Sequence, residues 1–356
     1  MSNALEILKL AEEFLLNEVR PRAQEIDRDP ETLRWALDGL AQRGFLGLRI
    51  SPEFGGMGIA EPEFRAFQEF VARASGSLAF LQTQHQSAAS LISKSDNEVL
   101  RTAYLANMAG GTARLGIGFS QLRRAGPPMM QASPIPAGYL LYGAVPWITG
   151  LGFFEEFVIG ATLPSGEAVF GIVPFREQPG IELSDVMQLC AMESAQTVSG
   201  EIKNLVLPHE RVLFIKPANW IANNDMINIT LQGHFALGCA QAGVDVLRQA
   251  YERKPLDFIL TTADQLQDEI DNCRQSAITS QGLAESTQER LDIRAWAIDL
   301  AVRCAHAAIT ASSGAANSLS HPAQRIYREA LVYTVSAQTS EIMRATLERL
   351  ASKITP

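Results

Sequence analysis

Two neighbouring stretches close to the C-terminus decide the fold of this chain. The first is His321-Pro322-Ala323-Gln324-Arg325-Ile326-Tyr327-Arg328-Glu329-Ala330, and the second is Ser336-Ala337-Gln338-Thr339-Ser340-Glu341-Ile342-Met343-Arg344. A proline directly after His321 is typical of a helix start, because the missing N–H of proline has no helical partner there. Beyond the second stretch, Leu347 and Leu350 continue the helical spacing that begins at Met343. We therefore predict two consecutive helices at the end of the chain.

Outside these stretches, the pattern of apolar residues divides the chain into three parts. Apolar residues recur at helical spacing from residue 4 to about 110, and again from about 216 to the end. Between about 115 and 213, short β-rich runs alternate with proline and glycine. The runs at 156–159 and 168–173 flank Pro164-Ser165-Gly166 and predict a hairpin. This order of helices, β-module and helices indicates an α+β chain that is mainly α.

Several motifs together resemble the acyl-CoA dehydrogenase family. The two C-terminal stretches align without a gap with the family patterns P-x-x-R-x-Y-R-D-A and Y-E-G-T-S-E-I-x-R. Further matches follow in the family's order, namely PEFGGMG at 52–58, GAVPWITG at 143–150, LVLP at 205–208 and ERK at 252–254. The resemblance spans almost the whole chain. It implies an N-terminal helical domain (1–112), a central β-barrel domain (113–215) and a C-terminal four-helix bundle (216–356).

The resemblance also implies a missing catalytic base. In the family, the glutamate of Y-E-G-T removes the α-proton of an acyl thioester, and here that position holds Ala337. Some members place the base in an L-E-R-L segment instead, and the matching position here is Asn228. Neither side chain can accept a proton. His85 is the weak remaining acid–base candidate, and the chain has no other clear catalytic residue.

The resemblance points to residues that would bind a flavin. Trp147, Ile148 and Thr149 match the segment that lies against the isoalloxazine ring, and Thr339 matches a flavin-contacting threonine. Other expected contacts are Phe119 and Ser120, in the loop near residue 120, and Arg253 reaching the pyrophosphate from a neighbouring subunit. The glycine-rich motif that serves the adenine side keeps only one glycine within residues 310–316. The resemblance therefore implies FAD, with FMN or no flavin as the alternatives.

Composition limits the classes of partner. A net charge of −9 over 356 residues argues against a nucleic-acid surface, which needs a basic face. No apolar run reaches transmembrane length, and the N-terminus has no apolar signal core, so we expect a cytoplasmic protein without membrane insertion. None of the four cysteines forms a C-x-x-C or stands at zinc-ligand spacing with a histidine, so we expect free thiols and no metal.

Three functions stay open from the sequence. The first is an acyl-CoA dehydrogenase-like oxidoreductase, acting on an acyl-CoA or another small apolar substrate, with altered or lost dehydrogenation. The second is a flavin-dependent monooxygenase on the same fold, because His321 and Arg325 echo a pattern of such relatives. The third is a non-catalytic binding or assembly protein. The resemblance implies a homo-oligomer, either a tetramer or a dimer.

Overall fold

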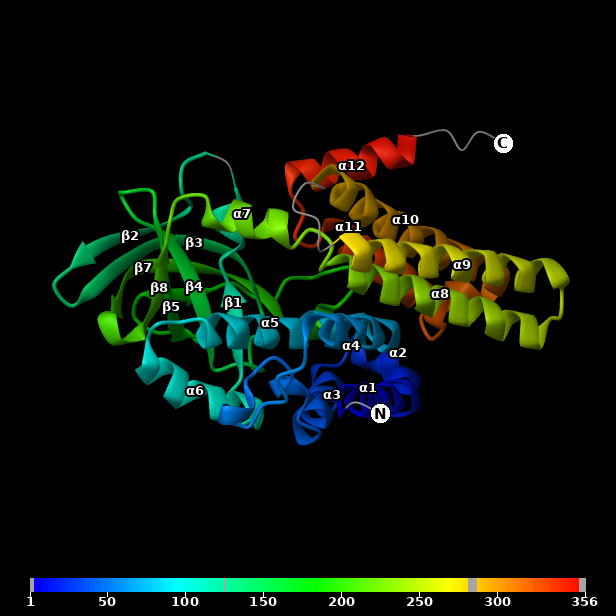
Figure 1. Ribbon diagram of the computed structural model, residues 1–356, viewed down its shortest axis with the longest axis horizontal. Coiled ribbons are helices and arrows are strands. Elements are labelled where there is room, and N and C mark those ends of the chain that lie inside the picture. Colours follow the sequence, from blue (N-terminus) through cyan, green and yellow to red (C-terminus); the bar gives the residue numbers. More distant parts are fainter. Residues whose placement is uncertain (1–2, 125, 281–286, 352–356) are drawn as a thin grey trace.

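The computed structural model describes residues 3–124, 126–280 and 287–351. N-terminal helices, a β-domain and a C-terminal bundle follow one another along the chain and pack side by side (Figure 1). The predicted α+β, mainly α class is confirmed. No helix in the described ranges is long and apolar enough to span a membrane.

Six helices form the N-terminal part, and they begin with a change of helix type. We expected helix over residues 4 to about 25, and the chain stays helical there. It passes, however, through a π-turn (Leu15–Val19) and a 3₁₀-turn (Arg20–Arg22) that contains Pro21, whose ring disfavours a regular α-helix. The α-helices are α1 (Asn3–Phe14), α2 (Ala23–Ile26), α3 (Pro30–Gln42), α4 (Glu61–Ala74), α5 (Gly76–Ser93) and α6 (Glu98–Ala109).

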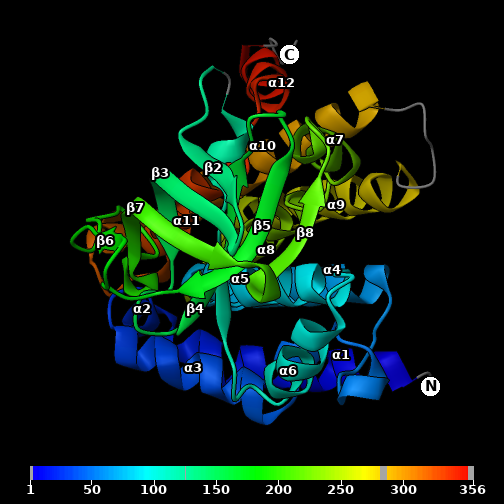
Figure 2. The same cartoon turned by 90° about the vertical axis from the view of Figure 1, so that its left-hand side faces the viewer.

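Eight strands build one mixed sheet that curls around an apolar core (Figure 2). Its hydrogen-bonded order is β6-β7-β3-β2-β4-β5-β8, with β1 paired to β4. The predicted hairpin is confirmed, because β4 and β5 run antiparallel with Ile159 opposite Gly171. The strands are β1 (Leu115–Gly118), β2 (Met130–Ile135), β3 (Gly138–Thr149), β4 (Glu156–Thr162), β5 (Ala168–Pro174), β6 (Ile181–Leu183), β7 (Thr197–Pro208) and β8 (Val212–Lys216).

The C-terminal part is organised around one central helix, α8. A Cβ on Gly238 would collide with the main chain of Glu69 in α4, and a Cβ on Gly243 would lie 2.7 Å from the main chain of Cys304 in α10. These two glycines therefore let α8 approach both neighbours closely. The helices are α7 (Trp220–Ile227), α8 (Gly233–Arg253), α9 (Asp257–Thr279), α10 (Thr287–Ser312), α11 (Pro322–Val335) and α12 (Ser340–Ala351).

The stretch from His321 to Ala330, most of which lies in α11, joins distant parts of the molecule. Arg325 and Glu329 form a buried ion pair, with 2.6 Å between Nη1 and Oε1, and the N–H of Gly76 donates to the same carboxylate. Arg328 donates to the carboxylate of Asp27 at 2.7 Å and to the carbonyl of Cys190 at 2.6 Å. The motif thus connects the bundle to the N-terminal helices and to the β-domain.

Candidate functional site

The turn between α11 and α12 places Ala337 at the surface in a left-handed conformation, with a φ of 49°. This region of φ is unfavourable for a residue that carries a Cβ, so the turn holds local backbone strain. Thr339 follows it and is half-buried. Its Oγ1 accepts from the N–H of Ile342 at 3.3 Å and so caps the start of α12.

The second vacant base position lies in the connection between α7 and α8. Asn228 ends α7 and uses its side-chain amide to donate to the carbonyl of Asn224 at 2.8 Å. Its neighbours Met226 and Ile229 belong to a small apolar cluster that also contains Ile342 of α12. The α7–α8 connection therefore lies against the first turn of α12, close to the turn that holds Ala337.

A buried arginine lies beside this turn. Arg294 of α10 is 1% exposed, and its Nη2 donates to the carbonyls of Tyr333 at 3.4 Å and Ser336 at 3.2 Å. Burial lowers the pKa of its guanidinium to about 10. Its Nε and Nη1 have no hydrogen-bond partner within the described ranges. The site thus contains a buried cation next to the position where the family pattern has a carboxylate.

The end of β3 presents the segment expected to meet the flavin ring. Trp147 is 47% exposed, and it lies where the pairing of β3 with β7 shifts register between Val145 and Ile148. Trp147 is therefore not a buried residue of the barrel core. Ile148 is fully buried, and the hydroxyls of Thr149 and Thr197 lie 3.0 Å apart in a buried hydrogen bond. The bulge thus leaves the indole of Trp147 about half exposed, two residues before a buried pair of hydroxyls.

The loop after β1 carries the other expected flavin contacts. Ser120 opens a short 3₁₀-helix, and its buried Oγ has no partner within the part of the chain that is described. The side chain of Phe119, in contrast, packs edge-on against Phe170 in the core of the sheet, with 5.5 Å between the ring centroids. Among these two, Ser120 is therefore the one whose side chain is available to a ligand.

Arg123 in the same loop has a structural partner. It forms two hydrogen bonds with the carboxylate of Asp225 in α7, with 2.7 Å and 3.0 Å between the atoms. A bidentate pair of this kind fixes the direction of the guanidinium. Arg123 therefore anchors α7 to the β-domain and is not free to hold a phosphate.

The contacts expected on the dinucleotide side lie apart from the β-domain. Arg253 is exposed at the last turn of α8, and α8 points away from the β-domain (Figure 1). The last turn of α8 is therefore far along that helix from the β-domain that carries Trp147. Residues 310–316, expected to serve the adenine, form the end of α10 and a 3₁₀-turn in which Ser313 has a φ of 54°.

His85 and His321 lie in different surroundings, and both ring nitrogens of His85 lack a hydrogen-bond partner within the described ranges. His85 is fully buried, and burial lowers its pKa to about 4, with the charge of Arg114 as the next cause. His321 caps α11, because its Nδ1 accepts from the N–H of Ala323 at 3.2 Å. His321 therefore serves as a helix cap, whereas His85 is a buried imidazole whose lowered pKa favours the neutral form.

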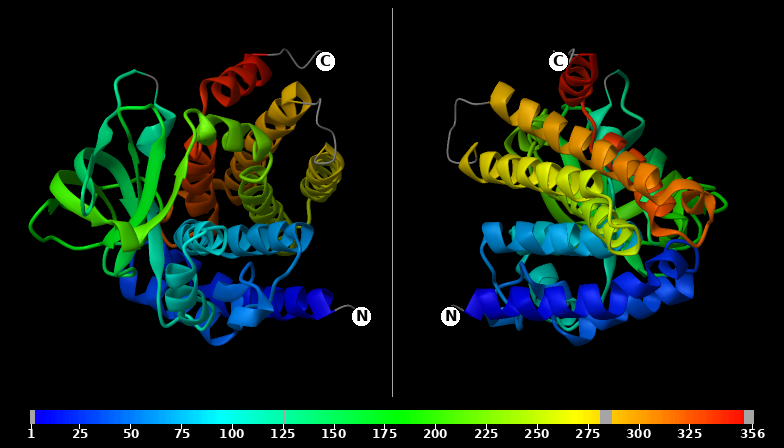
Figure 3. Two further views of the ribbon diagram at one scale, coloured as in Figure 1. Left: turned by 60° about the vertical axis from the view of Figure 1, so that its left-hand side comes forward. Right: turned by 90° about the vertical axis from the view of Figure 1, so that its right-hand side faces the viewer.

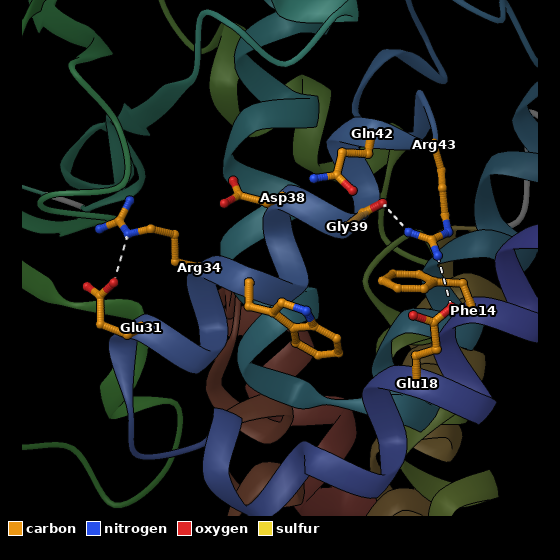
Figure 4. Close-up of a pocket in the computed structure, with 9 residues that line it drawn as sticks. Phe14, Glu18, Glu31, Arg34, Asp38, Gly39, Gln42 and Arg43 are labelled. Carbon is orange, nitrogen blue, oxygen red and sulfur yellow. Dashed lines mark hydrogen bonds and ion pairs between the residues drawn. The ribbon is translucent and has the colours of Figure 1, made fainter.

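A hollow of about 390 Å³ on the N-terminal helices offers no alternative site (Figure 4). Its arginines are already paired. Arg43 donates to Glu18 at 2.9 Å and to the carbonyl of Gly39 at 3.2 Å, and Arg34 lies 3.6 Å from Glu31. No group of three or more potential metal ligands was found in the described ranges.

The observations on the β-domain side fit a flavin ring. They comprise an exposed indole, a buried threonine hydroxyl and the Ser120 hydroxyl that lacks a partner. Sequence reasoning missed Arg294 and Asp225. Arg294 could have been noticed, because it interrupts an apolar helix face that contains Leu291, Ala295 and Ile298. Asp225 gave no signal, since its partner is 102 residues away in sequence.

Comparisons with known proteins identify the family and the fold of the chain. Models of the acyl-CoA dehydrogenase N-terminal and C-terminal domains match residues 2–112 and 277–351. A 3-(aryl)acrylate reductase of Clostridium sporogenes is 22% identical over 95% of both chains, and a probable acyl-CoA dehydrogenase of Bacillus subtilis is 23% identical over 96% of both. The structure of an acyl-CoA dehydrogenase complexed with FAD from Bacillus anthracis superposes with a TM-score of 0.82 at 20% identity, covering 99% of this chain and 67% of that one. The C-terminal match contains the stretches at 321–330 and 336–344, and the chain belongs to the acyl-CoA dehydrogenase family.

Proposed function

We propose that this protein is a flavin-dependent oxidoreductase that acts on the CH–CH bond of an acyl thioester or a similar small apolar substrate, and that its proton abstraction is lost or slow. We call Ser120, Trp147 and Thr149 the ring-binding edge. The single observation that carries the proposal is that the chain keeps an exposed Trp147 in this edge but has an alanine at position 337. The first supports a flavin, and the second argues against ordinary dehydrogenation.

Each site residue has a proposed role. FAD, when bound, would supply the hydride acceptor. Trp147 would give the ring a flat apolar surface, and the hydroxyls of Ser120 and Thr149 would donate hydrogen bonds to its edge. The main-chain N–H of Ala337 would polarise a thioester carbonyl, as a donor in an oxyanion hole does. Without a carboxylate at 337 or 228, neither position can take up the α-proton.

The oligomeric state is part of this proposal. Arg253 lies at the far end of α8, so a phosphate contact by this residue requires a second copy of the chain. We propose a homodimer or a homotetramer in which Arg253 of one copy approaches the ring-binding edge of another.

The experiment that tests the function starts with a visible absorption spectrum of the purified protein and the mass of the released cofactor. Bound FAD near one per chain supports the flavin site. Addition of acyl-CoA without oxygen then tests dehydrogenation, with slow or absent bleaching as the expected result. An aryl acrylate with a reductant tests the opposite direction, because the Clostridium sporogenes relative is a reductase by name.

Two outcomes favour the other functions. Substrate-dependent oxygen consumption by the reduced protein would favour a monooxygenase. No flavin, even after addition of FAD or FMN, would contradict the proposal and favour a binding or assembly protein. Fast bleaching by acyl-CoA would contradict the proposed loss of proton abstraction, and would show that another base replaces position 337.

A further inference from the structure

A second pocket, of about 310 Å³, lies between α4, α8 and α9. Figure 3 shows these helices side by side on the bundle side of the molecule. The pocket shares no residue with the ring-binding edge or with the turn at Ala337. Ala66, Phe70 and Ile278 contribute apolar surface, while Arg65 and His234 bring polar atoms. It is therefore an apolar pocket with a few placed polar groups, as small-molecule sites usually are.

Glu69 organises the polar side of this pocket. One carboxylate oxygen lies 2.6 Å from Nδ1 of His234, and the other accepts from Nε of Arg274 at 2.8 Å. The carboxylate accepts a hydrogen bond from Nδ1–H, so it fixes the orientation of the imidazole and leaves Nε2 as the ring's remaining polar atom. Both oxygens of Glu69 are thus used, and Glu69 itself is not the group that meets a ligand.

Two buried nitrogen atoms in the pocket lining lack partners within the described ranges. His234 is 2% exposed, and its Nε2 has no hydrogen bond. Arg65 is also buried, and its Nη1 has none, although its Nε donates to Glu61 at 3.2 Å. A buried polar atom without a partner is unfavourable, so two such atoms in the lining of one pocket point to a ligand or to ordered water.

Arg65 and His234 both line this pocket. Arg65 and Glu69 are four residues apart on α4, which places them on one face of the helix, and Glu69 holds His234 by a direct hydrogen bond. Arg65 offers an N–H, while Nε2 of His234 accepts a hydrogen bond when the ring is neutral and donates one when the ring is charged. A carboxyl group matches this pair in both states, because its two oxygens can accept from Arg65 and share a proton with Nε2.

We propose that the pocket between α4, α8 and α9 binds a monocarboxylic acid with a short apolar chain, through Arg65 and His234. The carboxyl group meets the two nitrogens, and the chain lies against Phe70, Ala66 and Ile278. A neutral ester fills the same volume but presents no acidic proton and no negative charge. Selection of the acid over its ester is therefore the property that separates this site from a plain apolar cavity.

The test uses hexanoate and methyl hexanoate as probes in isothermal titration calorimetry of the full-length protein with its bound cofactor. We expect hexanoate to bind at least about tenfold more tightly than the ester, because the neutral ester cannot form the charge-assisted hydrogen bond that the carboxylate forms with Arg65. Arg65→Met and His234→Leu should each reduce this preference about tenfold or more while leaving ester binding within about twofold. Arg34→Met, which removes an arginine outside the pocket, is the matched control and should change neither affinity.

Ala66→Phe provides an independent check, because it fills the pocket without touching a polar group. It should abolish binding of both probes while flavin content and the circular dichroism spectrum stay unchanged. Equal affinity for hexanoate and its ester in the wild-type protein would overturn the proposal. So would hexanoate binding that survives Ala66→Phe, since the acid would then occupy another site.

Discussion

Arg294 donates a hydrogen bond to the carbonyl of Ser336, with 3.2 Å between Nη2 and O, so a buried guanidinium lies next to the residue that precedes Ala337. The cation also lies at the C-terminal end of α11, where the helix dipole favours a positive charge. A carboxylate introduced at position 337 would therefore meet a preorganised cation.

Ala337→Glu should give acyl-CoA oxidation that exceeds that of the matched Ala337→Gln but remains below full activity. The positive charge of Arg294 would lower the pKa of the new carboxyl group and weaken it as a base, and the contacts expected for the dinucleotide are altered as well. Anaerobic flavin bleaching by acyl-CoA measures the difference, which we expect to be about 10²-fold. Equal rates for the two variants would show that position 337 does not face the substrate, and full activity of Ala337→Glu would contradict the altered cofactor site.

Trp147→Ala and Ile148→Ala should separate cofactor binding from stability. Trp147 is half exposed, so its loss should reduce flavin affinity about tenfold and change the free energy of unfolding by less than about 1 kcal/mol. Ile148 is fully buried, so its truncation should cost about 2–5 kcal/mol. Fluorescence titration with FAD and thermal unfolding measure the two effects. Unchanged flavin affinity in Trp147→Ala would remove this edge from the site.

His85→Leu should flatten the loss of stability in acid. The pKa of His85 is about 4 in the folded protein and 6.5 in the unfolded chain, so the unfolded chain binds more protons between these values. Stability therefore falls as the pH drops from about 6.5 to about 4, by about 3 kcal/mol from this group. Unfolding midpoints of the wild type and the variant across this range give the difference. Parallel curves would mean that His85 titrates normally.

Arg325→Met should destabilise the protein by about 3–5 kcal/mol, because it leaves the carboxylate of Glu329 buried without its cation. Lys203→Met is the control, since Lys203 and Glu182 form a pair at the same 2.6 Å distance but on the surface. We expect that control to cost less than about 1 kcal/mol. Denaturation midpoints that shift equally in the two variants would show that burial of the first pair contributes nothing.

Leu331→Arg should shift the protein to a smaller assembly. Tyr327, Leu331 and Val335 form an exposed apolar row along α11, and Met343, Leu347 and Leu350 form another on α12. Contiguous apolar surface of this kind marks a contact between proteins. Val99→Arg is the control, because Val99 is exposed on α6 outside these rows. Light scattering after size-exclusion chromatography measures the mass, and an unchanged mass for Leu331→Arg would place the interface elsewhere.

Local patterns in the sequence predicted much of the fold. The proline after His321, the helical spacing beyond Met343 and the hairpin around Pro164-Ser165-Gly166 each depend on residues close together in the chain. The change of helix type before Pro21 was not predicted, because its apolar spacing differs little from that of an α-helix.

The site was predicted less completely than the fold. Motif position located Trp147 and Ala337, but it could not show that the Phe119 side chain is in the core or that Arg123 is paired. Those outcomes depend on partners such as Phe170 and Asp225. The pair formed by Glu69 and His234, separated by 165 residues, likewise gives no signal before the chain is folded.

The hydrogen bond between Arg328 and Asp27 has a consequence for synthesis on the ribosome. The two residues are 301 positions apart, and Asp27 is almost fully buried once the chain is folded. Until α11 has been translated, this carboxylate lacks its cation, and closing the N-terminal helices around it would bury an unpaired charge. The helices around Asp27 therefore reach their final packing only after α11 has been made.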